Sequence, residues 1–154
     1  MKSPLSTGLL ILFFCLHFIT SINCSLLQKP ARNLQPCSIF SDNMVLQQNT
    51  IIPVWGTSEP GGAVVVKIAG QTRRSRVSQT GDWRVNLRPL SAGGPFEMLI
   101  IGRDTTVINN VCVGEVWLCS GQSNMEMPLA GWGKVKDFEK EIAEAHFSDI
   151  RLFQ

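Results

Sequence analysis

The strand pattern that recurs along most of the chain is clearest in G-D-W-R-V-N-L, which is Gly81-Asp82-Trp83-Arg84-Val85-Asn86-Leu87. Its apolar residues Trp83, Val85 and Leu87 alternate with polar ones, which is the period of a β-strand with one buried face. The preceding Thr80-Gly81-Asp82 is typical of a turn. The pattern therefore predicts a turn followed by a half-buried strand.

Similar strand patterns recur on both sides of this stretch, at spacings of about ten residues. The expected strands cover 51–55, 63–69, 96–100 and 105–108, with turns at 60–62, 92–95 and 102–104. Short strands closed by Gly, Pro or Asp favour an antiparallel β-sandwich, which we place at residues 25–112. Trp55 and Trp83 lie inside strand patterns, so we expect core residues rather than sugar-stacking platforms.

The pattern changes after residue 112. Residues 113–119 predict an apolar strand, and residues 134–146 carry apolar side chains at helical spacing with glutamates opposite. Residues 150–153 have the composition of a further strand. Strand, loop, helix and strand make a βαβ unit, and a parallel sheet needs cover on both faces. We therefore expect residues 113–154 to be the opening of an incomplete α/β domain.

Residues 1–24 have the composition of a secretory signal peptide. Lys2 precedes the apolar run 9–19, and small or polar residues follow it. The run is too short to span a membrane, which takes about 20 residues; a buried helix and a signal anchor are the alternatives. A cleaved signal implies the secretory pathway, either lysosomal or extracellular, without stable membrane insertion after cleavage.

Charge and cysteine content exclude several functions. The chain has 14 Lys plus Arg against 12 Asp plus Glu, and these are scattered, so no nucleic-acid partner is expected. After signal cleavage Cys37, Cys112 and Cys119 remain, an odd number that implies a free thiol or a missing partner and leaves the pairing open. No C-x-x-C spacing occurs and only two histidines are present, so no zinc site is expected.

A serine motif follows the expected strand at 113–119. Gly121-Gln122-Ser123-Asn124-Met125 would lie past the carboxyl end of that strand, where open α/β sheets bind ligands. The motif is not the nucleophile elbow G-x-S-x-G, because Met125 replaces the second glycine. From spacing alone, Ser123 is either a nucleophile or a residue of a turn or helix cap.

Five separated motifs give residues 37–154 a family resemblance. They are V-G-E-V-W-L-C-S-G-Q-S-N-M-E-M-P-L at 113–129, S-D-N-M-V-L-Q at 41–47, P-V-W-G at 53–56, G-D-W at 81–83 and A-G-G-P at 92–95. Together they resemble the sialate O-acetylesterase family of SGNH-type hydrolases, which is related to bacterial acetyl-xylan esterases. The resemblance implies a β-sandwich followed by the first βαβ unit of an SGNH-type α/β hydrolase domain.

The resemblance also implies roles for single residues. Ser123 matches the nucleophile, and its backbone N–H would contribute to an oxyanion hole. Gly121, Gln122 and Asn124 match the residues that shape this loop, and we assign them oxyanion and loop support. The implied reaction is hydrolysis of O-acetyl esters on sugars of the sialic acid type, without metal or cofactor. The family's catalytic aspartate and histidine belong to later motifs that have no counterpart in these 154 residues.

Four titratable residues surround the motif. His146 ends the expected helix, where a histidine interacts with the helix dipole and solvent. His146 and Asp149 could form half a triad, but the family places the aspartate before the histidine, so we reject that role. Glu115 and Glu126 flank the serine; they could orient the loop, although a solvated or capping role is the stronger expectation.

Two functions therefore remain. The first is the N-terminal part of a secreted acetylesterase. The alternative is a short secreted β-sandwich that binds or acts as a scaffold and lacks the catalytic histidine. Residues 151–154 enter an apolar strand with no polar tail, which is an aggregation liability for a short product and favours the first function. We expect the 154 residues alone to have negligible esterase activity, because a serine without its base is a poor nucleophile.

Signal cleavage is directly testable. Expression in a secreting cell should give a product whose first residue lies close to Ser25, because the polar exit after residue 19 marks the cleavage region. N-terminal sequencing of the secreted protein measures this. A product that retains Lys2 and stays with the membrane fraction would instead support the signal anchor.

Overall fold

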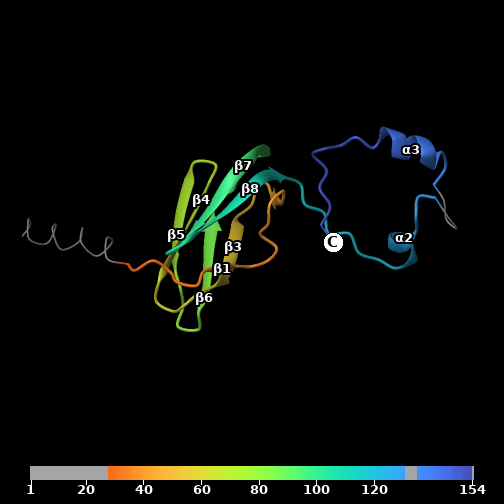
Figure 1. Cartoon of the computed structure of the whole chain (residues 1–154). Coiled ribbons are helices and arrows are strands. Elements are labelled where there is room, and N and C mark those ends of the chain that lie inside the picture. The colour runs from red at the N-terminus through yellow and green to blue at the C-terminus, as the bar shows by residue number, and fades with distance from the viewer. Residues whose placement is uncertain (1–27, 131–134, 154) are drawn as a thin grey trace, which may run out of the picture.

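The computed structural model describes residues 28–130 and 135–153. The signal peptide predicted at 1–24 lies outside the described residues. Within the described part, eight strands form two β-sheets that share one hydrophobic core (Figure 1). No helix of the described residues is long and apolar enough to cross a membrane.

The two sheets have different sizes. The three-stranded sheet has the order β1 (Gln35–Pro36), β3 (Ile52–Thr57), β6 (Asp82–Leu87). The five-stranded sheet has the order β2 (Val45–Gln47), β8 (Thr105–Gly114), β7 (Gly93–Ile101), β4 (Ala63–Ile68), β5 (Gln71–Arg76). All neighbours run antiparallel except β2 and β8, which run parallel. We call residues 28–114, which hold both sheets, the two-sheet unit.

The alternation predicted around Trp83 is confirmed. Along β6 the side chains of Trp83, Val85 and Leu87 are buried, and the residues between them are exposed. The same alternation on β3, β4, β7 and β8 places valine, isoleucine and methionine side chains of both sheets in one core cluster. Burial of this apolar surface is the main term that stabilises the fold.

Trp83 and Gly56 form one packing unit across two strands. They are direct partners in the β3–β6 register, and Trp83 Nε1 donates a hydrogen bond of 3.0 Å to the carbonyl oxygen of Thr57. A Cβ atom at Gly56 would lie 2.8 Å from the Trp83 ring and 2.1 Å from the carbonyl oxygen of Gln35. The glycine is therefore required for the tryptophan ring to pack against β3 and for β1 to pair with β3.

The prediction that both tryptophans are core residues is right for Trp83 and wrong for Trp55. Trp83 is 2% exposed, but Trp55 is 39% exposed. Ile52 and Val54 take the inward positions of β3, so Trp55 points to the outer face, where its ring meets Phe40 edge-on at 4.8 Å between centroids.

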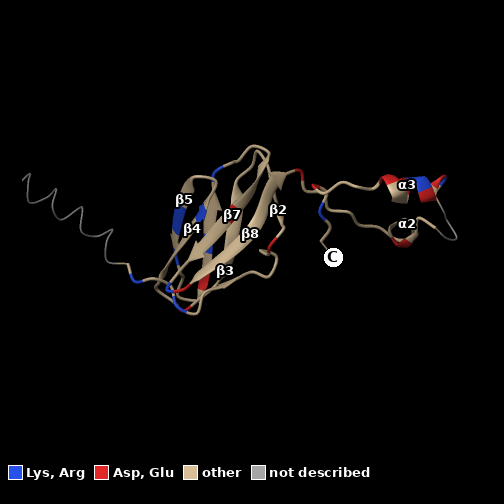
Figure 2. Ribbon diagram, turned by 45° about the horizontal axis from the view of Figure 1, so that its top comes forward, with Lys and Arg blue, Asp and Glu red and all other residues tan. Residues whose placement is uncertain are grey.

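Other differences from the predicted strands have simple causes. The strand β5 was not predicted because its sequence Q-T-R-R-S-R has no apolar residue, and it lies at a sheet edge, where arginines hinder pairing with other chains (Figure 2). The turn predicted at 92–95 is the start of β7 instead. This turn-like sequence fits into β7 because the pairing with β8 shifts register between Gly93 and Met98, which makes this part of the strand irregular.

The βαβ unit predicted for residues 113–154 is not formed. β8 ends at Gly114, and neither 115–122 nor 150–153 is a strand. The helix predicted at 134–146 covers Phe138–Glu144 (α3) in the described residues, and α3 has no buried residue. A strand needs a hydrogen-bonded neighbour and a helix needs a face to pack on, and the described part of the chain offers neither here.

As a result, apolar side chains of this region are exposed. Trp117 is 82% and Leu118 is 96% exposed, and Leu152 and Phe153 on the returning chain are similarly open. Figure 1 shows α3 and the short helix α2 (Ser123–Glu126) standing away from the sheets, while the end of the chain returns toward them. Within α3, Lys140 and Glu144 form an ion pair at 3.8 Å, which is solvent-exposed and contributes little to stability.

The two tryptophans allow a matched test of the core. Trp83→Ala should lower the free energy of unfolding by about 3–5 kcal/mol, because a fully buried ring is removed and leaves a cavity. Trp55→Ala should lower it by about 1 kcal/mol, since its ring is largely in solvent. Urea unfolding of the mature chain measures both. Equal losses for the two variants would contradict the described packing.

Candidate active site

Ser123 is the first residue of α2 and is solvent-exposed. The backbone turns there with Gln122 at φ −111° and ψ −126°, and the Met125 N–H donates to the carbonyl oxygen of Gln122 at 2.9 Å. Within the described part of the chain the Ser123 hydroxyl has no hydrogen-bond partner. The side chain is therefore open to a ligand and is not occupied as a helix cap.

The three neighbours expected to support the loop are also exposed. A Cβ atom at Gly121 would lie 2.9 Å from Met125 Cγ, so any larger residue there would displace the methionine. Gln122 contributes its backbone carbonyl to the turn, and Asn124 lies in the first turn of α2 without a side-chain contact among the described residues. Gly121 and Gln122 thus shape the loop locally.

Neither His146 nor Asp149 reaches the serine through any described contact. His146 lies beyond α3 and is exposed, and its backbone N–H donates to the carbonyl oxygen of Glu144 at 2.8 Å. Its ring has no partner within residues 28–130 and 135–153. Within the described residues, therefore, neither side chain is hydrogen-bonded to Ser123.

Glu115 has two hydrogen-bond partners that the sequence analysis did not identify. Its carboxylate accepts hydrogen bonds from Gln48 Nε2 at 2.5 Å and from Gln47 Nε2 at 3.2 Å. Gln47 Oε1 accepts from the N–H of Val116 at 2.8 Å. These contacts fix the backbone where it leaves β8 toward the serine. Glu115 is solvent-exposed, as the solvated role requires, and its hydrogen bonds fit the alternative that it orients the loop. Glu126 has no hydrogen-bond partner among the described residues.

The same hydrogen bonds also act on the ionisation of this carboxylate. The amides of Gln48 and Gln47, in that order, hold the pKa of Glu115 below its ordinary value of 4.5, because they favour the ionised form. The two glutamines stand side by side at the end of β2, within and next to the S-D-N-M-V-L-Q phrase. These two adjacent glutamines are the feature of the sequence from which the contact with Glu115 could have been predicted.

The three cysteines among the described residues are free thiols, and the same residues hold no metal site. Cys37 and Cys112 are half-buried and Cys119 is exposed, with no disulfide between them. Across residues 28–130 and 135–153, no group of three His, Cys, Asp or Glu side chains is placed to bind an ion. The arrangement offers one accessible hydroxyl in a tight turn, which suits acyl transfer once a base is supplied.

The chain is similar to curated proteins called sialate O-acetylesterase. It is 34% identical to the one of Mus musculus over 129 residues, which is 75% of this chain and 23% of that protein. It is 35% identical to the one of Homo sapiens over 104 residues, which is 60% of this chain and 20% of that protein. No protein-family model matches the chain.

A solved structure is similar as well. The crystal structure of a carbohydrate acetylesterase from Xanthomonas citri matches with a TM-score of 0.66 and 35% sequence identity, over 73% of this chain and 26% of that one. The chain thus spans about a quarter of the length of the relatives that it matches.

The contacts of Glu115 predict a pH effect of known sign. Because its folded pKa is lowered, its contribution to stability is present above the unfolded value near 4.5 and is lost as pH falls through the folded pKa. A carbon NMR titration of the Glu115 carboxyl should show a lower midpoint in the folded chain than in urea. Gln48→Ala should raise that midpoint, and Gln71→Ala, in another hairpin, should not. An unshifted wild-type midpoint would contradict the contact.

Proposed function

Because the chain belongs to the sialate O-acetylesterase family, we propose that Ser123 is the nucleophile of an esterase that removes O-acetyl groups from sugars of the sialic acid type. The observation that carries this assignment is the position of Ser123. Its hydroxyl is exposed, free of partners among the described residues, and held at the start of a short helical turn. A nucleophile requires such access to a substrate carbonyl.

The reaction would proceed in two acyl transfers. Ser123 Oγ attacks the acetyl carbonyl carbon while a base takes the hydroxyl proton. The tetrahedral intermediate collapses with cleavage of the bond between that carbon and the sugar oxygen, which takes up the proton and leaves as the free sugar hydroxyl. Water then attacks the acetyl-enzyme, and acetate leaves as Ser123 recovers its proton. The backbone N–H of Ser123 would donate to the oxyanion, and Gly121, Gln122 and Asn124 would keep the turn open around it.

The base and its aspartate would come from outside these 154 residues. His146 is not oriented toward Ser123 by any described contact, and the family order excludes it.

The domain arrangement follows from the same assignment. We place a signal peptide at 1–24, a β-sandwich domain at 25–112, and at 113–154 the opening of an SGNH-type α/β domain in a lysosomal or extracellular enzyme. The exposed Trp117, Leu118 and Phe153 are the surface that the rest of such a domain would cover.

One observation favours the alternative, a secreted binding or scaffold module. All buried hydrophobic residues of the described chain lie between Ala31 and Val113. The two-sheet unit therefore has a complete core without residues 115–151, which we call the serine segment. Such a module would fold alone and would carry Ser123 without using it.

A pair of neighbouring serines distinguishes these functions. In the longest secreted form that contains residues 25–154, Ser123→Ala should lower acetate release from an O-acetylated sialic acid by about 10⁴- to 10⁶-fold, because the nucleophile is lost. Ser120→Ala, in the same exposed segment, is the control and should keep most of the rate. The 154-residue chain alone should release no acetate above buffer.

Full activity of the Ser123→Ala protein would overturn the nucleophile assignment. If the longest secreted form ends with residue 154 and is inactive, the binding module is the better description.

A further inference from the structure

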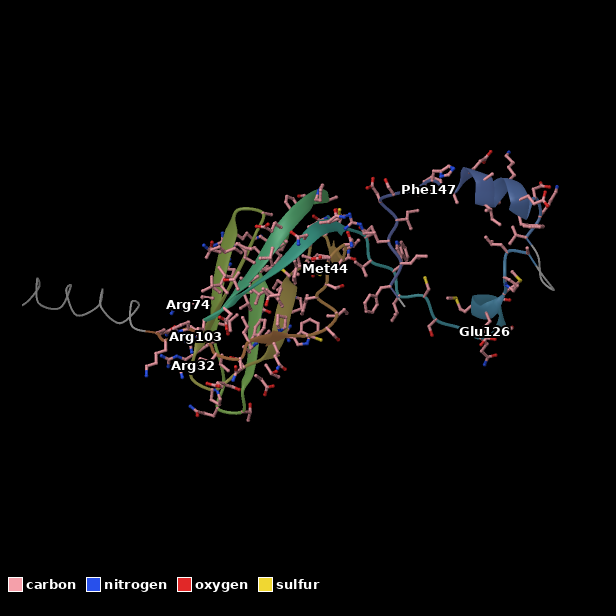
Figure 3. The ribbon with its side chains drawn as sticks, viewed as in Figure 1. Arg32, Met44, Arg74, Arg103, Glu126 and Phe147 are labelled. Carbon is pink, nitrogen blue, oxygen red and sulfur yellow. The ribbon has the colours of Figure 1, made fainter. Side chains whose placement is uncertain are left out.

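Both ends of the serine segment meet at one edge of the five-stranded sheet. The segment leaves β8 at Gly114, and the chain returns with Arg151 to the same edge, where β2 pairs in parallel with β8. In Figure 3, Met44 lies at this end of the two-sheet unit, and Glu126 lies on the far side of the segment. The chain therefore leaves and returns at the same edge of the sheet.

The leaving end is fixed by β2. Besides the contacts of Glu115 and Val116 with Gln47, the backbone N–H of Gln48 donates to the carbonyl oxygen of Gly114 at 2.8 Å. A strand end and two side-chain amides thus hold the first residues after β8.

The returning end is fixed by one arginine. Arg151 Nη1 donates to the carbonyl oxygens of Met44 at 3.2 Å and Asn110 at 2.5 Å, and Nη2 donates to Asn110 Oδ1 at 3.1 Å. A planar guanidinium can make these bonds together, whereas a lysine ammonium has no such fixed fork. The charge-assisted bonds are stronger than neutral ones.

The backbone conformation and the side-chain hydrogen bond of Asn110 both favour its contact with Arg151. Its φ is +56°, in the left-handed region that asparagine tolerates better than most residues. Its Nδ2 donates to Asn43 Oδ1 at 2.6 Å, which leaves Oδ1 free to accept from Arg151. The neighbouring N–H of Asn109 donates to Asp42 Oδ1 at 2.7 Å. The residues of the S-D-N-M-V-L-Q phrase therefore hold both ends of the segment.

We propose that Gln47, Gln48, Asn110, Glu115 and Arg151, together the polar clamp, are positioning residues for the Ser123 segment, a role that rests on the proposed function. Between residues 117 and 150 no described side chain is buried. Among the described residues, the hydrogen bonds of the clamp are the ones that join the segment to the sheets. The two-sheet unit thus sets the direction in which the nucleophile is presented.

The competing explanation is that the clamp only stabilises the fold in general. The two explanations differ in whether a change at one end of the segment affects the other end. If the clamp holds the segment as a unit, removal of Arg151 should also free the N–H of Val116, which lies at the other end and bonds to Gln47. The core strands β4 and β6 should be unaffected, because their hydrogen bonds and buried side chains do not involve the clamp.

Hydrogen–deuterium exchange of the mature chain tests this without substrate. Arg151→Ala should raise the exchange rate of the Val116 amide about tenfold, since hydrogen bonds to a charged group contribute enough for such a factor. Arg151→Lys should restore this protection only in part, because it keeps the charge but loses the fork. Arg103→Ala, at an exposed arginine of the two-sheet unit, is the matched control and should change nothing near Val116.

Two results would overturn the positioning role. One is an unchanged Val116 amide in Arg151→Ala; the other is faster exchange of β4 and β6 together with Val116, which would mean general destabilisation. The same measurement on Ser123→Ala should match wild type. Failure of the nucleophile assignment would appear in acetate release and would leave these exchange rates unaltered, so the two claims fail separately.

Discussion

The packing of the Trp83 ring on Gly56 is the contact on which the rest of the structure depends. It aligns β3 with β6, and the missing side chain at Gly56 also lets β1 approach. With these strands in register, Ile52 and Val54 face the five-stranded sheet and share its buried residues. The core then fixes β8, whose end at Gly114 is the point from which the serine segment starts.

Polar contacts hold the serine segment in place, whereas burial of apolar side chains stabilises the two-sheet unit. Hydrogen bonds at the edge of β2 hold its ends, and between these ends the described side chains are not buried, with Trp117 and Leu118 the most exposed apolar ones near its start. Such contacts contribute less to stability than a buried core and are easier to open. They can nevertheless set a direction, which is the contribution we assign to the sheets in presenting Ser123.

Alternating apolar residues and turn residues were enough to predict most of the longer strands of the two-sheet unit. β6 and β7 follow from apolar residues at every second position, whereas the polar edge strand β5 has no such signal. The βαβ pattern at 113–154 is present in the residues but has no neighbouring strand to pair with in the described chain. Ser123 followed from a family resemblance. The contacts of Glu115 and Arg151 join residues far apart in sequence through side-chain hydrogen bonds, which leave no periodic pattern.

Covalent labelling tests the role of Ser123 most directly. The longest secreted form that contains residues 25–154 would be treated with a fluorophosphonate, which loses fluoride when an activated serine hydroxyl attacks its phosphorus, and digested for peptide mass spectrometry. We expect an adduct on Ser123 and a loss of acetate release in proportion to the adduct. An adduct on another serine, or acetate release that continues after Ser123 is fully modified, would contradict the nucleophile assignment.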